Sequence, residues 1–188
     1  MIDGVFILEM LKKGNMAREI VKNEFNQLSF EEMNWKPELN NWSIGQCLDH
    51  LIISDCSYFP SFKKITEQNF EMNFWENWSP LGGFFGKILV SQVKEIPRKK
   101  LNSPGIFYPS QSDIDMGIVE RFNKHLDSLL NYIADCNKID VDKTYITSPL
   151  SKLVTYSLRN AITLIIQHLQ RHINQAIKIK SLKEFPLQ

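Results

Sequence analysis

Residues 156–180 read YSLRNAITLIIQHLQRHINQAIKIK, and this stretch predicts the fold most directly. Its apolar residues recur at steps of three and four, which is the period of an amphipathic helix. Ser157 is suited to cap the start, because its hydroxyl can accept a hydrogen bond from an unpaired backbone N–H. We expect a helix from Ser157 to about Lys180, with these residues facing inward: Leu158, Ile162, Ile165, Leu169, Ile173, Ala176 and Ile177.

Three further segments have the same period. A first helix is expected over residues 2–27, a second begins at the Ser43 cap, and a third is capped by Ser112 or Asp113 and ends near Cys136. Pro60 should kink or divide the second. Their expected inward residues are Val5, Leu8, Leu11, Ile20, Glu24 and Leu28 in the first, Ile44, Leu48, Leu51, Ile52 and Phe59 in the second, and Ile118, Phe122, Leu126, Leu129, Leu130 and Ile133 in the third.

The segments between the long helices are less regular. Ser29 and Glu32 form the pattern of a capping box, which predicts a short helical turn that ends before Pro37. Residues 70–111 read as a long crossover with a short helix at 80–95, and residues 138–156 read as a linker. Four long helices and one long crossover predict an all-α four-helix bundle, with a single domain over residues 1–188.

Composition excludes several classes of protein. The chain has 188 residues, 43% hydrophobic and 23% charged, and a net charge of +1, so it supplies no field that would attract nucleic acid. The three cysteines, Cys47, Cys56 and Cys136, form neither a CxxC pair nor a disulfide framework, which suits a reducing cytoplasm. No apolar stretch approaches the ~20 residues that span a bilayer, and the N-terminal run GVFILEML lacks the basic flank of a signal peptide. We expect a cytoplasmic protein that binds neither nucleic acid nor membrane.

Four histidines occur in the chain, and two of them stand four residues apart in HLQRH. On a helix, His168 and His172 would lie one above the other, with Cβ atoms ~5–6 Å apart and within reach of one metal ion. An HxxxH pattern alone is a weak signal, since two packing histidines can fall four apart by chance. The surrounding residues, among them Leu164, Leu169 and Ile173, are strongly apolar, and burying two unpaired imidazoles there would be costly.

The other two histidines are ambiguous by position. His50 lies seven residues after Ser43, beside the apolar stripe of the second helix, where it can face either a neighbouring helix or solvent. His125 lies among Phe122, Leu126 and Leu129 of the third helix, where a lone histidine is more often a packing residue than a ligand. We therefore leave His125 out of the candidate site.

Two stretches resemble a known family. The run NWKPELNNWSIGQCLDHLIISD resembles the first signature of the DinB-like (DinB/YfiT-like) metalloenzyme superfamily, in which a tryptophan and a serine begin the helix that carries a metal-binding histidine. The run YSLRNAITLIIQHLQRHINQA resembles its second signature, with two histidines four apart. SPLGGFFGKIL and the run from KKLNSPGIFYPS onward resemble the larger-insert branch. Together the resemblance covers roughly residues 5–180 and implies metal ligands at His50, His168 and His172.

The implied cofactor is a divalent transition metal, with zinc or nickel favoured and iron or manganese as alternatives. In HExxH zinc proteases a glutamate base follows the first histidine, but here that position is Leu169, so we do not expect a protease of that type. Gln46 and Gln175 stand one helical turn from His50 and His172, where either amide could bond an imidazole N–H or a substrate.

Several other residues have more than one reading. Asp49 should point away from His50 toward the surface, and Cys47 could be a fourth ligand or a reactive thiol, although such a cysteine is more often simply buried. The crossover aromatics could line a substrate pocket or only cover the open end of the bundle: Phe74, Trp75, Trp78, Phe84 and Phe85. The basic residues after them could hold an anionic substrate or be a solvated face: Lys94, Arg98, Lys99 and Lys100.

The resemblance implies activity only broadly, since members of the family include enzymes that transfer or isomerise with small thiols such as bacillithiol or mycothiol. We expect a metal-dependent S-transferase whose partners are a small-molecule thiol and an electrophilic substrate. A metal-dependent hydrolase that acts through a bound hydroxide is the nearest variant. A stress-associated metal-binding protein without turnover is the alternative from another class, and a homodimer formed through faces of the bundle is compatible with either.

Overall fold

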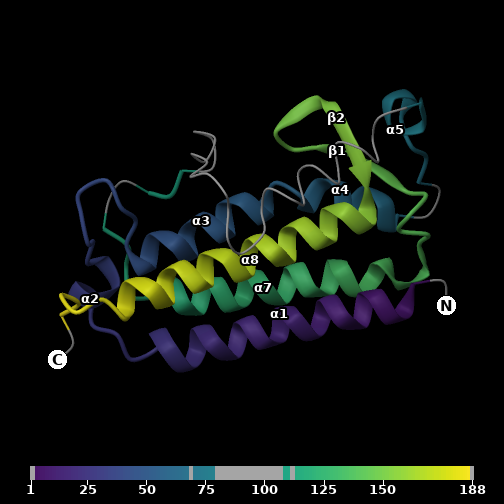
Figure 1. Cartoon of the computed structure of the whole chain (residues 1–188). Coiled ribbons are helices and arrows are strands. Elements are labelled where there is room, and N and C mark those ends of the chain that lie inside the picture. The colour runs from purple at the N-terminus through teal and green to yellow at the C-terminus, as the bar shows by residue number, and fades with distance from the viewer. Residues whose placement is uncertain (1–2, 68–69, 79–107, 111–112, 187–188) are drawn as a thin grey trace.

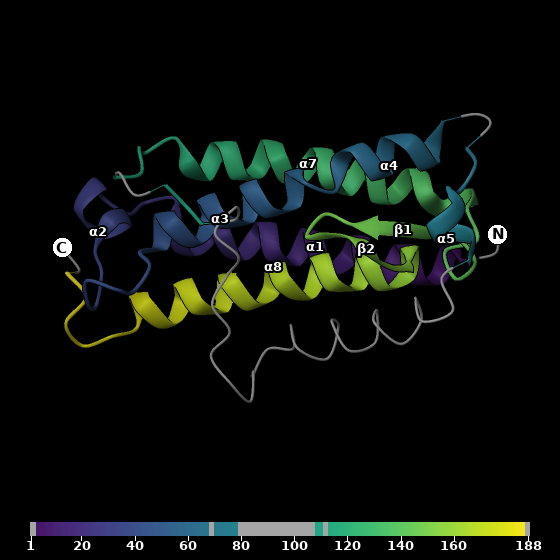
Figure 2. The same cartoon turned by 90° about the horizontal axis from the view of Figure 1, so that it is seen from above.

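The computed structural model describes residues 3–67, 70–78, 108–110 and 113–186. Among these residues, four long helices pack side by side, and they confirm the predicted all-α bundle (Figures 1 and 2). They are α1 (Gly4–Phe25), α3 (Ile44–Cys56), α7 (Ile118–Asp135) and α8 (Leu158–Lys180). The shorter elements are α2 (Phe30–Asn34), α4 (Phe59–Thr66), α5 (Phe74–Trp78), the 3₁₀ turn η2 (Cys136–Lys138), β1 (Tyr145–Ser148) and β2 (Ser151–Ser157).

The first and last long helices run parallel, and α3 and α7 run in the opposite direction (Figure 1). Two ion pairs show directly that α1 and α8 run parallel. Asp3, just before α1, pairs with Arg159 at the start of α8, and Glu24 near the end of α1 pairs with Lys180 at the end of α8. Because α8 lies between α1 and α3, its two sides pack against one parallel and one antiparallel neighbour.

Helix starts follow the local sequence closely. Ser29 and Glu32 form the predicted capping box at α2, and Ser43 forms a second one with Gln46 at α3. Ser157 caps α8 by accepting a hydrogen bond from the backbone N–H of Asn160. The second predicted helix is divided as expected, since α3 ends at Cys56 and α4 begins at Phe59 with Pro60 in its first turn.

The expected inward face of α1 is wrong for Val5 and Leu8, whereas Leu11 and Ile20 pack against the core and Leu28 is buried as predicted. Val5 and Leu8 are 85% and 66% exposed, and the buried set is Ile7, Met10, Gly14, Ala17, Val21 and Phe25. Both sets have helical spacing, so periodicity alone cannot choose between them. The small residues decide the register, because Leu130 of α7 lies where a side chain at Gly14 would be. The glycine allows α1 and α7 to approach closely.

The third long helix begins later than predicted. Asp113 does not cap it, since α7 begins at Ile118 after Gly117, and the alternative cap Ser112 lies outside the described residues. Asn34 explains the delay, because its side chain accepts a hydrogen bond from Ile114 N at 2.7 Å and donates one to Ile114 O at 2.9 Å. The second bond occupies the carbonyl of Ile114, which in a helix starting at residue 113 would accept from the N–H of Ile118.

Residues predicted to be a linker form an antiparallel β-hairpin, in which Tyr145 pairs with Ser157 and Ile146 with Tyr156. The hairpin lies against the start of α8 (Figure 2). Two contacts also tie the hairpin to residues outside α8. The Tyr58 and Tyr156 hydroxyls are 2.9 Å apart, and Glu76 of α5 accepts hydrogen bonds from both the backbone N–H and the hydroxyl of Thr147. The predicted helix at residues 80–95 lies outside the described residues.

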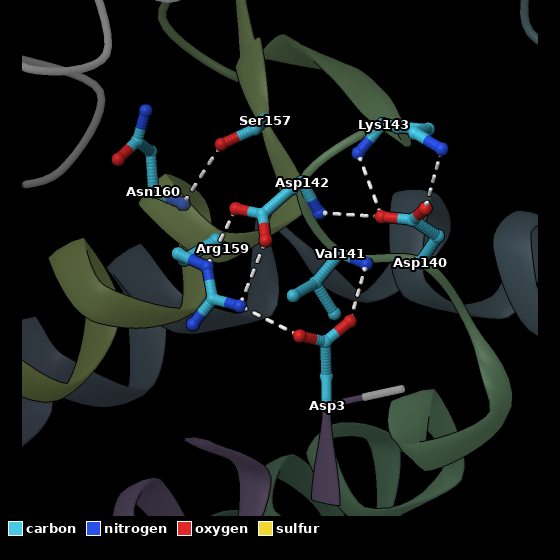
Figure 3. A network of polar contacts seen from close by, with 8 residues as sticks. All are labelled: Asp3, Asp140, Val141, Asp142, Lys143, Ser157, Arg159 and Asn160. Carbon is cyan, nitrogen blue, oxygen red and sulfur yellow. Dashed lines mark hydrogen bonds and ion pairs between the residues drawn. The ribbon is translucent and has the colours of Figure 1, made fainter. Parts of the chain in front are cut away.

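An ion-pair network fastens the start of α1 to the start of α8 (Figure 3). Arg159 donates to Asp3 Oδ1 at 2.7 Å and to both carboxylate oxygens of Asp142. Asp3 also accepts a hydrogen bond from Val141 N, and the Arg159 guanidinium lies 4.2 Å from the centre of the Phe6 ring. Within the described part of the chain, no helix is both long enough and apolar enough to cross a membrane.

Replacing Asn34 by Ala should destabilise the fold by about 1–3 kcal/mol, because it leaves two backbone groups of the buried Ile114 without their partners. Urea denaturation measures this loss. The matched control is Asn15→Ala on the exposed face of α1, which should change stability by less than about 0.5 kcal/mol. Equal stability of the two variants would show that Asn34 does not hold the start of α7.

Candidate metal centre

Residues far apart in the sequence meet between α3 and α8. The Ser43 capping box fixes the start of α3 and therefore the side of the helix on which His50 lies. His50 is only 2% exposed. From α8, His168 is partly buried and His172 is buried, and their spacing of four residues places both on the same side of the helix. The structure thus brings together the three histidines that the sequence had paired with a family signature.

The three imidazole rings form a compact triangle. Ring centres are 4.9 Å apart for His50 and His168, 4.5 Å for His50 and His172, and 4.6 Å for His168 and His172. One ring nitrogen from each histidine lies within 4.8 Å of those from the other two. The Nε2 atoms of His50 and His168 are 3.1 Å apart.

This geometry fits a single transition-metal ion. Two nitrogens that each bind one tetrahedral ion at ~2.0–2.1 Å lie about 3.3 Å from each other, close to the observed separation of Nε2 atoms. The Nδ1 atom of His172 is buried and has no well-formed hydrogen bond. Gln175 approaches the same ring and partly opposes the effect of burial on its pKa, which agrees with the interaction expected from its position. No carboxylate belongs to this group of ligand atoms.

The environment keeps the imidazoles of His168 and His172 neutral. Burial, followed by the effects of the neighbouring His50 and Arg171, lowers the pKa of His168 to about 3. Burial also holds the pKa of His172 well below its ordinary value, with added effects from His168, His50 and Arg171. A neutral imidazole has a free lone pair, and that is the form that binds a metal.

Trp42 covers two of the three rings. Its ring centre is 4.7 Å from that of His50 and 5.5 Å from that of His172, and it stacks on the second at an interplanar angle of 28°. Sequence reasoning placed this tryptophan in a family signature but gave it no contact with the site. Its position just before the Ser43 cap is the signal that could have suggested the contact.

The residues flanking His50 have structural roles. Gln46 does not reach an imidazole, as its side chain completes the Ser43 capping box and donates to Ser110 O at 2.8 Å. Asp49 was expected on the surface, but it is partly buried and accepts a hydrogen bond from Ser110 N. Cys47 is fully buried in the apolar core, where burial raises the pKa of its thiol far above the ordinary value. The reading of Cys47 as a buried packing residue is the one that fits.

Other candidates lie away from the triangle or cannot be placed. His125 is on α7 and belongs to neither group of described residues that could hold a metal. Phe74 is exposed on α5, and the other crossover aromatics lie outside the described side chains. The basic residues from Lys94 to Lys100 lie outside the described residues as well.

Asp3, Asp140 and Asp142 form the other group of described residues whose ligand atoms lie close together. Figure 3 shows why this acidic group differs from the histidines. Arg159 bonds both Asp3 and Asp142, and Asp140 accepts hydrogen bonds from the backbone N–H groups of Asp142 and Lys143. Each carboxylate already has a cation or backbone N–H as its partner, so the group acts as a structural tie.

Comparison with known proteins agrees with the fold. No curated protein and no solved structure matches the chain significantly. The family model described as DinB superfamily matches residues 15–176, which include all three histidines of the triangle and both helices that carry them. Because the match spans far more than half of its length, the chain belongs to the DinB superfamily.

Proposed function

We propose that this chain is a metal-dependent enzyme that transfers a small thiol to an electrophile, with the metal held by His50, His168 and His172. The observation that carries the proposal is the triangle of imidazole nitrogens between α3 and α8, in which burial keeps His168 and His172 neutral. When bound to three neutral ligands, a divalent ion keeps its full charge and an open position, and it lowers the pKa of a coordinated water or thiol.

Two features of the site favour transfer of a thiol over hydrolysis. Leu169, in the position of the HExxH glutamate, is fully buried in the core, so this position offers no general base. Trp42 covers His50 and His172 on one side and limits access of water there. A thiol that ionises more readily than water needs less help from a protein base, which favours a thiol over a hydrolytic nucleophile.

The donor set also favours certain metals. Imidazole ligands suit zinc, nickel, copper and iron, whereas manganese and magnesium favour carboxylate oxygens. A site of three imidazoles therefore supports zinc or nickel as the resident ion. Iron is the next candidate, and manganese is the least suited of the four metals considered.

Each single substitution His50→Ala, His168→Ala and His172→Ala should lower zinc affinity by at least about 100-fold, because one of three ligands is lost. Equilibrium dialysis against zinc followed by elemental analysis measures this, on protein purified without a nickel column. His125→Gln is the matched control, since it changes a buried histidine outside the triangle and should keep full metal content. Wild-type protein that binds no zinc or nickel would refute the metal site.

Binding of nickel or copper should quench part of the tryptophan fluorescence, because the Trp42 ring lies against two of the proposed ligands. Titration of metal-free protein with Ni²⁺ gives the quenching curve. Trp42→Phe should remove most of the metal-dependent change, and Trp35→Phe should keep it because Trp35 packs against Phe185 instead. Equal quenching in both variants would place the bound ion elsewhere.

Zinc-loaded and nickel-loaded protein should consume electrophiles only when a small thiol is present, and His168→Ala should abolish this turnover. The assay combines a panel of alkyl and epoxide electrophiles with bacillithiol, glutathione and cysteine, and mass spectrometry detects the thioether product. Turnover without thiol would support the hydrolase instead. Metal binding without turnover in any combination would support the non-catalytic metal-binding protein.

A further inference from the structure

A second group of reactive side chains lies where α3 ends against α7. Cys56, the last residue of α3, is exposed, and its Sγ atom lies 3.6 Å from Nδ1 of His125. His125 is buried, with 9% of its surface exposed. The Phe59 ring stacks on the imidazole with 5.1 Å between ring centres and an interplanar angle of 14°, which fixes the orientation of the imidazole.

The far edge of the same imidazole faces a buried carboxylate. Nε2 of His125 is 3.9 Å from Oδ2 of Asp55, and it is a buried atom without a hydrogen-bond partner. Asp55 is only 2% exposed; burial raises the pKa of its carboxyl, and His125 acts in the opposite direction. An imidazole that gained a proton from the thiol would therefore be stabilised by this carboxylate.

The other two cysteines lack such a neighbourhood. Cys47 and Cys136 are fully buried, and burial raises the pKa of the Cys136 thiol to about 12. Cys136 donates a hydrogen bond to Tyr132 O instead of facing a base. Partial burial and then the charge of Asp55 raise the pKa of Cys56 as well, so its thiol holds its proton at neutral pH. Reaction at Cys56 therefore needs a base in contact with the sulfur, and His125 occupies that position.

We propose that Cys56, His125 and Asp55 form a thiol–disulfide exchange site that takes small organic disulfides. The Cys56 sulfur attacks one sulfur of the disulfide RSSR while His125 accepts the thiol proton. The new bond joins Cys56 to RS, the bond between the two sulfurs of RSSR breaks, and the leaving RS⁻ takes the proton from His125 as RSH. No external oxidant is required, because the disulfide itself is the oxidant.

This site is separate from the histidine triangle. Cys56 lies six residues beyond His50, which is about 9 Å along the axis of a helix. His50 faces α8, whereas Cys56 contacts a side chain of α7. The exchange site therefore does not depend on the proposed metal, and its reaction should be the same in metal-free and zinc-loaded protein.

The test measures the reaction of wild-type protein with dipyridyl disulfide, an uncharged probe that releases an absorbing thiopyridone. One equivalent should react rapidly, and intact mass with peptide mapping should place the adduct on Cys56. The matched control is Cys56→Ala combined with Asn15→Cys, which moves the only exposed thiol to α1, where no histidine lies nearby in the sequence. Cys56 should react about tenfold faster than this control at neutral pH.

His125→Gln should lower the rate at Cys56 by about tenfold, and Cys56→Ala should leave only the slow reaction of buried cysteines. Circular dichroism checks that both variants are folded. If His125→Gln fails to fold, the comparison of wild type with the Asn15→Cys control still tests the proposal. Without a base beside it, a thiol with a raised pKa should react more slowly than the control cysteine. A rate no higher than that of the control, or one unchanged by His125→Gln, would overturn the proposal.

Asp55 is a positioning residue in this proposal, and its test uses the pH dependence of the rate. The titratable groups in contact with the imidazole are Cys56 and Asp55 of α3, and Phe59 of α4 covers its face. Asp55→Asn removes the carboxylate that would stabilise the protonated ring, so the pH profile of the rate at Cys56 should differ from that of wild type. An unchanged pH profile would remove Asp55 from the site and leave the exchange to Cys56 and His125.

Discussion

The structure depends on the meeting of three imidazoles between two antiparallel helices. Polar rings inside an apolar bundle are costly unless they stay neutral and have partners, and the centre of each ring here lies within 5 Å of the centres of the other two. This constraint fixes how α3 lies on α8, because a shift by one turn would separate His50 from both His168 and His172. The Ser43 capping box and the Trp42 stack hold α3 in that position.

Sequence was informative where the deciding contacts are local. The caps at Ser29, Ser43 and Ser157 act within three residues, and each was predicted. The start of α7 and the β-hairpin were missed because their contacts are distant. Asn34 reaches Ile114 across 80 residues, and Tyr58 reaches Tyr156 across 98. Val5 and Leu8 were wrongly expected to face inward, because the close approach of α7 at Gly14 decides which side of α1 is buried. That contact cannot be read from the sequence of α1 alone.

The same difference between local and distant contacts applies to the histidine triangle and to the Cys56 site. The spacing of His168 and His172 is a local pattern, so their common side of a helix could be read from the sequence. His50 was ambiguous by position, and only the family resemblance joined it to the pair. The neighbourhood of Cys56 could not be predicted, because His125 lies 69 residues away and its apolar neighbours indicate a packing role. His125 does pack against Phe59, and it also presents a nitrogen to the thiol.

The two ion pairs between α1 and α8 join residues with the same separation of 156 positions, at both ends of the helix pair. The helices are therefore held in axial register along their length, although one is synthesised long before the other. On the ribosome, the apolar side of α1 must wait for α8 to emerge before it gains this neighbour. Folding of the bundle is thus completed only after α8 has been translated.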